Sequence, residues 1–200
     1  KRHDSRDRVA PILAAVPAIE RVVMVQYAGE DSAGVNEKVI SLGDFLDGYS
    51  PEEIEFERFS FNHPLYIMYS SGTTGAPKCI VHGAGGTLIQ HLKEHRLHAD
   101  LNPDDRLFYF TTCGWMMWNW LVTGLASGVT VLLYDGSPFY PDGNVIFDFI
   151  DETRMTHFGT SAKFIDAVKK AGLEPTKSHD LSTLKTILST GSPLAPESFD

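Results

Sequence analysis

From Pro64 to Thr190, short runs of β-branched and aromatic residues alternate with segments of helical periodicity. The runs expected to form strands are 65–70, 79–82, 107–112, 129–134, 156–159 and 184–190, and the segments expected to form helices are 85–97, 115–126, 144–153 and 161–172. The apolar runs lack strict alternation with polar residues, as is usual for strands that are buried on both faces. This order predicts an α/β fold with a largely parallel sheet flanked by helices.

Residues 1–60 carry weaker signals. Apolar residues recur at helical spacing over 5–16, and Pro17 then argues for the end of that helix. A β-branched run at 21–27 predicts a strand. The rest is expected to be a polar surface connection with room for one short strand at 39–42.

Composition excludes several classes of protein. The net charge of −9 and the pI near 5.3 disfavour nucleic acid and anionic membranes as partners. The sequence contains no run of 18 apolar residues, so no membrane span is expected. The two cysteines, Cys79 and Cys113, give no disulfide framework and fit a reducing compartment, so a cytoplasmic location is expected.

The stretch YIMYSSGTTGAPK, residues 66–78, leads from an apolar run into a loop of small and hydroxyl-bearing residues. Ligands bind at the carboxyl ends of strands in a parallel sheet, and this loop is expected at such an end. Its glycines let backbone N–H groups approach a ligand, its hydroxyls donate hydrogen bonds, and its lysine adds a positive charge. These features predict a cradle for polyphosphate oxygens. The cradle residues are Ser70, Ser71, Gly72, Thr73, Thr74, Gly75 and Lys78.

The loop does not have the spacing of a Walker A motif. Lys78 follows Pro77, and Cys79 stands where the magnesium-binding hydroxyl would be. A flexible polar turn stays open as an alternative, because Ser, Thr and Gly are common in loops.

The run YSSGTTGAPK resembles the phosphate-binding signature of the adenylate-forming acyl-CoA synthetase superfamily. The stretches 78–95, 108–121, 131–144, 158–163 and 187–200 are similar to the acetoacetate-activating branch of that superfamily. The resemblance implies an acid–thiol ligase that uses ATP with Mg²⁺, forms an acyl-adenylate with release of pyrophosphate, and transfers the acyl group to coenzyme A with release of AMP. The implied partners are small molecules: acetoacetate, ATP and coenzyme A.

The resemblance also assigns roles to residues. The cradle would hold the triphosphate, with Thr73, Thr74 and Lys78 as its catalytic members. The turn Gly191, Ser192 and Pro193 corresponds to the loop that receives the adenine ring. No metal site built from protein ligands is implied, because Mg²⁺ can rely on substrate phosphates.

The run WMMWNW, residues 115–120, corresponds to the part of the superfamily that lines the acyl pocket. Trp115 and Trp118 are bulky enough to shorten the pocket, and Asn119 would donate to the keto oxygen of acetoacetate; Trp115 and Asn119 are the favoured site residues. The other members of the run are interpreted as core residues of a buried helix.

Residues 1–200 contain no counterpart of the superfamily's later motifs, its hinge or its C-terminal domain with a catalytic lysine. We therefore expect 1–200 to be the central part of the N-terminal adenylation (AMP-binding) domain, with the C-terminal domain absent. Such a segment would need the remainder of its own chain as a partner and would lack turnover alone.

Three alternatives stay open. A ligase for acetate or propionate is disfavoured, because related acetate-activating enzymes often carry an acidic residue at the position of Ser192. The run HLKEH suits a zinc hydrolase in which His91 and His95 bind the metal and Glu94 is the general base, although an exposed polar helix face explains it more simply. The third alternative is a nucleotide-binding module without catalysis.

Overall fold

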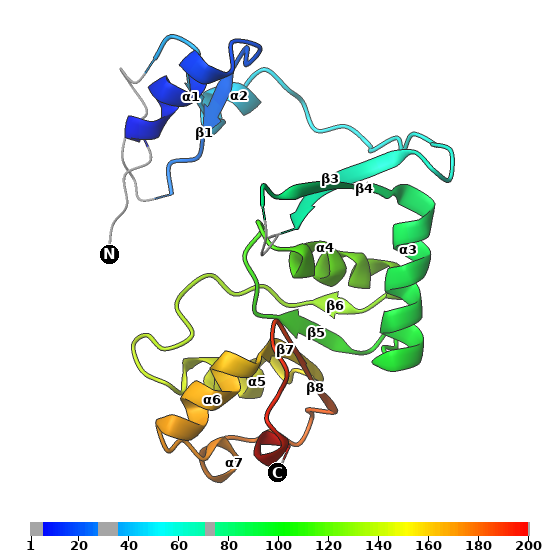
Figure 1. Ribbon diagram of the computed structural model, residues 1–200, viewed down its shortest axis with the longest axis vertical. Helices are drawn as coiled ribbons and strands as arrows, with labels where there is room; N and C mark the ends of the chain where they lie inside the picture. The colour runs from blue at the N-terminus through cyan, green and yellow to red at the C-terminus, as the bar shows by residue number, and fades with distance from the viewer. Residues whose placement is uncertain (1–5, 28–35, 71–74, 200) are drawn as a thin grey trace. The chain divides into compact units, whose positions relative to one another are not determined.

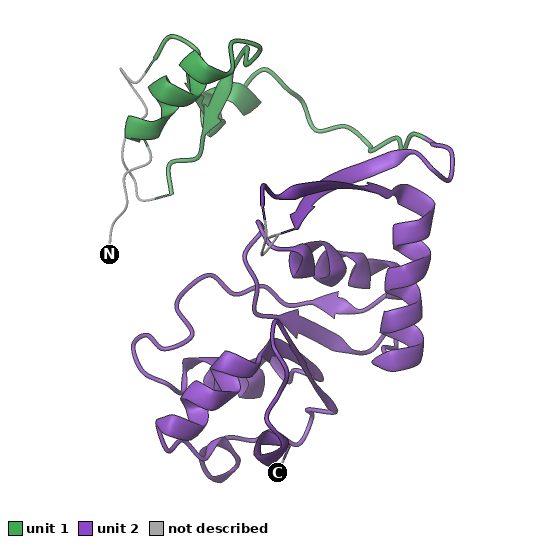
Figure 2. Cartoon of the chain, in the orientation of Figure 1, with its two compact units in different colours: residues 1–57 green, residues 58–200 purple. Residues whose placement is uncertain are grey.

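The computed structural model describes residues 6–27, 36–70 and 75–199 of the chain. These residues form two compact units, with a boundary between Glu57 and Arg58 (Figure 2).

The first unit is a small α/β assembly. Its elements are η1 (Arg6–Arg8), α1 (Val9–Ala15), β1 (Val22–Met24), β2 (Val39–Ser41) and α2 (Leu42–Leu46). The two strands pair in parallel, and the expected helix and both expected strands are confirmed. Helix α2 was not predicted from the sequence. Its main local signal is a single cap, in which the Ser41 hydroxyl accepts from the Asp44 amide at 3.0 Å.

The second unit contains the strand–helix alternation seen in the sequence. Its elements are β3 (Pro64–Ser70), β4 (Lys78–Gly83), α3 (Ala84–Lys93), the π-helix η2 (Glu94–His98), β5 (Arg106–Tyr109), α4 (Met116–Thr123), η3 (Gly124–Ser127), β6 (Thr130–Val131), α5 (Val145–Thr153), β7 (His157–Ser161), α6 (Ala162–Lys170), α7 (Pro175–Ser178), β8 (Thr186–Thr190) and η4 (Pro196–Ser198). Four strands form a parallel sheet in the order β6-β5-β7-β8. This arrangement confirms the predicted α/β fold with a largely parallel sheet and flanking helices.

The parallel sheet lies between two layers of helices (Figure 1). Successive residues of a strand point to opposite faces, and β5 shows this directly. Leu107 and Tyr109 pack with α4, whereas Phe108 packs with residues of α5 and α6. On the α4 side, Met117 and Trp120 belong to the buried core, as expected for most of the aromatic run.

The pairing of β3 corrects one expectation. The loop after this strand was expected at the carboxyl edge of the parallel sheet, but β3 pairs antiparallel with β4 in a separate two-stranded sheet. A parallel pair needs a crossover of about a dozen residues or more, and only residues 71–77 separate the two strands. The hairpin lies over α4 on the side away from the parallel sheet (Figure 1).

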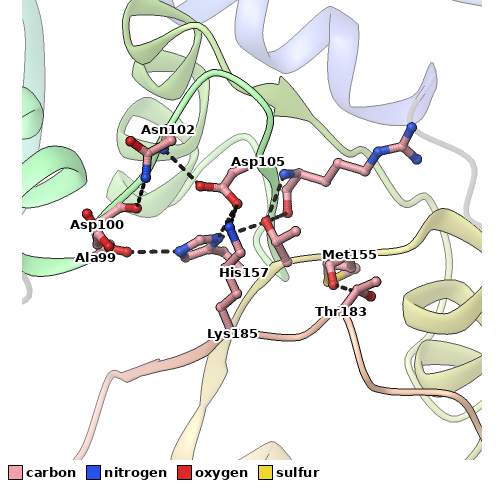
Figure 3. A network of polar contacts seen from close by, with 10 residues as sticks. Ala99, Asp100, Asn102, Asp105, Met155, His157, Thr183 and Lys185 are labelled. Carbon is pink, nitrogen blue, oxygen red and sulfur yellow. Dashed lines mark hydrogen bonds and ion pairs between the residues drawn. The ribbon is translucent and has the colours of Figure 1, made fainter.

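A polar network ties together the amino ends of three parallel strands (Figure 3). Asp105 precedes β5, and its carboxylate accepts from Lys185 Nζ at 2.7 Å and from the Asn102 amide at 2.8 Å. His157 begins β7 and donates through Nε2 to the carbonyl of Ala99 at 2.9 Å. Lys185 precedes β8, so one buried carboxylate helps to align the sheet.

The charge of Asp105 depends on these contacts. Burial acts to raise the pKa of Asp105, but hydrogen bonds, above all from Lys185, bring it below the usual value. A carboxyl group with a lowered folded-state pKa stabilises the fold above its unfolded-state pKa, and this stabilisation is lost as the pH falls through the folded-state value.

Lys185→Met is therefore expected to move acid unfolding to higher pH. Burial would remain while the strongest hydrogen bond to Asp105 is lost, so the pKa of Asp105 would rise. Tryptophan fluorescence followed through an acid titration of the full-length protein measures the shift. Lys177→Met is the control, because Lys177 is exposed and pairs with the exposed Glu174. Equal acid midpoints in the two variants would contradict the prediction.

Within residues 6–27, 36–70 and 75–199, none of the helices has the length and apolarity needed to cross a membrane.

Candidate active site

The loop end of the hairpin brings together the two described flanks of the predicted phosphate cradle. In the antiparallel register Ser70 lies opposite Lys78, so a hydroxyl and an ammonium group come from facing strands. Lys78 is exposed, and a Cβ added to Gly75 would have no atom within 4 Å. Ser71, Gly72, Thr73 and Thr74 lie outside the described residues.

Trp115 stands at the start of α4, where the chain enters the helix from the carboxyl end of β5. Its ring meets the Tyr109 ring edge-on, with centroids 6.1 Å apart, and the residue is 36% exposed. The Tyr109 hydroxyl donates to the carbonyl of Thr160 at 3.0 Å, and burial raises the pKa of Tyr109 to about 12. The phenol therefore stays protonated and fixes the ring beneath Trp115.

Asn119 contacts β3 through its side chain and is linked to α3 through Thr123 of the same helix. Its side-chain Nδ2 donates to the thioether sulfur of Met68 on β3 at 3.5 Å. Its backbone carbonyl accepts from the Thr123 hydroxyl at 2.7 Å. That hydroxyl also lies 3.1 Å from His91 Nδ1 on α3. Since the hydroxyl hydrogen is directed to Asn119, the His91 ring nitrogen is the donor to Thr123.

The predicted adenine turn begins directly after β8. Gly191 has φ of +90°, a backbone conformation that favours glycine, and Ser192 and Pro193 are exposed. Because β5, β7 and β8 are parallel, this turn lies at the same edge of the sheet as the loop that leads to Trp115. The structure thus joins the hairpin to α4 through Met68, and places the adenine turn at the sheet edge from which α4 starts.

Three residues that the sequence analysis did not single out support this arrangement: Met68, Tyr109 and Thr160. Thr160 is 1% exposed, and its hydroxyl has no hydrogen-bond partner within the described part of the chain. No local motif marks them, because each acts through a partner that is distant in sequence.

The HLKEH run has a packing role that excludes the zinc-site interpretation. Glu94 accepts from the indole N–H of Trp120 at 2.9 Å, and His95 Nε2 donates to the Trp120 carbonyl at 3.1 Å. Burial lowers the pKa of His95 to about 4, so its ring is neutral near pH 7. Among the described residues, no three His, Cys, Asp or Glu side chains are arranged to hold a metal. The expected exposed helix face is also wrong, since His91 and His95 are buried against α4.

Comparisons with known proteins agree with the geometry. A sequence profile described as AMP-binding enzyme matches residues 2–200. The chain is 57% identical over its whole length to acetoacetyl-coenzyme A synthetase of Rhizobium meliloti and covers 31% of that protein. It is 44% identical over 98% of its length to malonamoyl-CoA synthetase vrtB of Penicillium aethiopicum, of which it covers 30%.

The same similarity extends to solved structures. A structure of acetoacetyl-CoA synthetase from Streptomyces lividans matches the whole chain with a TM-score of 0.87 and 42% sequence identity. The chain covers 30% of that structure, and it spans about a third of the length of the curated relatives that it matches.

Proposed function

Because the chain belongs to the AMP-binding enzyme family, we propose that the full-length protein is an AMP-forming acid–thiol ligase that activates acetoacetate with ATP and transfers it to coenzyme A. The observation that carries this proposal is the 57% identity to an acetoacetyl-coenzyme A synthetase, which extends over the whole chain. Residues 1–200 would form the central part of the N-terminal adenylation domain of a cytoplasmic enzyme.

The described flanks of the cradle fit a triphosphate. Lys78 supplies a positive charge opposite the Ser70 hydroxyl, and Gly75 leaves space beside the backbone. Lys78 would hold phosphoryl oxygens as a point charge, and we assign catalytic roles beside it to Thr73 and Thr74. Ser71 and Gly72 complete the proposed cradle. Mg²⁺ bound with ATP would neutralise part of the phosphate charge.

The cradle would act where charge develops. When the acid's carboxylate attacks the α-phosphorus, negative charge shifts toward the departing pyrophosphate. An ammonium group that is already in place stabilises this charge without reorganisation in the transition state. The turn at Gly191, Ser192 and Pro193 would present its backbone to the adenine ring.

The proposed acid substrate rests on the names of the relatives and on two residues at and near the start of α4. The names of the relatives point to acetoacetate and malonamate, which both carry a second carbonyl on the carbon β to the carboxylate. The Asn119 amide is a suitable donor to that oxygen, and the Trp115 ring would limit the length of the chain beyond it. Malonamate is the second candidate acid because of the 44% identity to a malonamoyl-CoA synthetase.

Pyrophosphate release by the full-length protein tests the proposal. The assay contains ATP, Mg²⁺, coenzyme A and one acid at a time from acetoacetate, malonamate, acetate, propionate and butyrate. Acetoacetate is expected to give the highest kcat/KM. Malonamate as the best acid would replace the substrate but keep the class, whereas release with none of the acids would reject a short-acid ligase.

Asn119→Leu is expected to lower kcat/KM for acetoacetate about tenfold, because the keto oxygen would lose its donor. The KM for ATP should stay within about twofold, since the phosphate cradle is untouched. Butyrate, which lacks the keto oxygen, is the matched control and should be affected much less. Equal losses for acetoacetate, butyrate and ATP would contradict the role of Asn119.

A further inference from the structure

We propose that Met68 is a positioning residue for the acid substrate: its thioether holds the Asn119 carboxamide and connects the strand before the phosphate loop to the helix of the acyl pocket. This inference rests on the proposed function, because the substrate contact of Asn119 belongs to it.

The position of Met68 on β3 suits this role. Exposure alternates along the strand, with Leu65, Ile67 and Tyr69 exposed and the residues between them half-buried. Met68 is one of the half-buried residues and reaches α4 through its sulfur atom, which lies 3.5 Å from Asn119 Nδ2. Two residues later, Ser70 ends the strand at the loop end of the hairpin. Met68 therefore connects the strand that leads into the phosphate loop with the helix of the proposed acyl pocket.

The remaining contacts show why the side chain of Asn119 needs such a partner. The backbone of Asn119 is fixed from the α3 side, through Thr123 and His91. These contacts set the place of the residue on α4, but they leave the carboxamide free to turn about its side-chain bonds. The bond to Met68 restrains that rotation. One N–H of Nδ2 is used on sulfur, and the second can donate to the substrate.

The weakness of the sulfur acceptor matters for the chemistry. A thioether accepts hydrogen bonds poorly compared with a carbonyl oxygen. Met68 can therefore orient the Asn119 amide before binding, while the substrate's keto oxygen remains the better acceptor. Orientation of a donor before binding reduces the entropy lost when the substrate binds.

Two substitutions separate this role from simple packing, because they are expected to act in opposite ways. Leucine keeps an apolar side chain of similar size but removes the acceptor, whereas glutamine is polar and supplies an amide oxygen to Asn119. If Met68 holds Asn119 through its acceptor, Met68→Leu is impaired and Met68→Gln is tolerated. If Met68 only fills space, the order is reversed.

The experiment uses steady-state kinetics of the full-length protein with acetoacetate, butyrate and ATP. Met68→Leu is expected to raise the KM for acetoacetate about threefold, with kcat, the KM for ATP and the KM for butyrate little changed. Met68→Gln should remain near the wild type. Ile67→Leu, on the exposed face of the same strand, is the matched control and should have no effect. In the Asn119→Leu background, Met68→Leu should add nothing, because its partner is already gone.

Three kinetic results would each overturn the inference. The first is a wild-type KM in Met68→Leu together with a loss in Met68→Gln. The second is an equal change for acetoacetate, butyrate and ATP, and the third is additivity with Asn119→Leu. Both Met68 variants could also melt below Ile67→Leu and lose activity toward every substrate. That result would show that Met68 has a structural role and is not a positioning residue. Absence of acetoacetate-dependent pyrophosphate release in the wild type would instead reject the proposed function itself.

Discussion

Replacing Lys78 with alanine in the full-length protein is expected to lower kcat for acetoacetate-dependent pyrophosphate release by about a hundredfold. Lys78 begins β4, opposite Ser70 in the hairpin register, and its charge is exposed at the loop end of the hairpin. The charge would stabilise the phosphoryl oxygens most strongly as pyrophosphate departs, so its loss should reduce the rate more than the affinity. Removal of one such preorganised group costs about 10²–10³ in kcat in well-studied enzymes.

Two matched variants sharpen this prediction. Lys78→Arg keeps the charge on a longer, planar group and should retain more activity than Lys78→Ala. Lys177→Ala removes an exposed lysine of α7 that pairs with Glu174, and it should have no effect. A Lys78→Ala enzyme that keeps a rate within about threefold of the wild type would exclude Lys78 from the catalytic machinery.

Gly159→Ala is expected to be the most destabilising of the substitutions discussed, by about 3 kcal/mol. A Cβ at this position would lie 2.0 Å from Cδ2 of the Tyr109 ring. The ring has no easy escape, since it is buried, bonded through its hydroxyl to Thr160, and packed between Trp115 and Trp120. Either β5 and β7 separate or the ring moves, and the second outcome also displaces Trp115 from the proposed acyl pocket.

Thermal unfolding of the full-length protein tests this expectation, and Gly86→Ala is its matched control. Gly86 lies in α3, and a Cβ there would have no atom within 4 Å. Alanine in that helix should stabilise the protein by about 0.5–1 kcal/mol, because it loses less conformational entropy on folding. Replacing glycine with alanine should therefore lower the stability of the protein at position 159 and raise it at position 86. Equal melting temperatures for the two variants would show that the contact between Gly159 and Tyr109 is not constraining.

The order of elements could be read from local patterns. The strands at 64–70, 78–83, 157–161 and 186–190 and the helices at 145–153 and 162–170 follow from apolar runs, periodicity and end signals that lie within a few residues of each other. Gly172, for example, is the last residue of the helix expected over 161–172, and it adopts φ of +65° just beyond α6. The lengths of the elements are less well predicted by local patterns. The strand expected over 129–134 is the edge strand β6, whose extent depends on pairing with a distant strand, and it forms only Thr130–Val131.

Some features of the candidate site could likewise be predicted from the sequence and others could not. The hydroxyl, glycine and lysine content of 70–78 is a local feature, so the sequence alone pointed to a phosphate cradle. Its setting in an antiparallel hairpin was not predicted, because strand direction depends on which strands meet across the sheet. HLKEH shows the same limit, since His91 and His95 have metal-ligand spacing in the sequence while α4 buries both rings in the structure.

The sequence by itself therefore determined the fold class, the order of most strands and helices, the phosphate loop and the family resemblance. Only the tertiary structure decided which residues meet: Met68 with Asn119, Tyr109 with Gly159, and Asp105 with Lys185. The physical reason is the separation in sequence over which each kind of interaction acts. Periodicity, capping and turn chemistry act between residues a few positions apart, whereas each of these contacts joins residues 50 or more positions apart that approach only when whole elements pack.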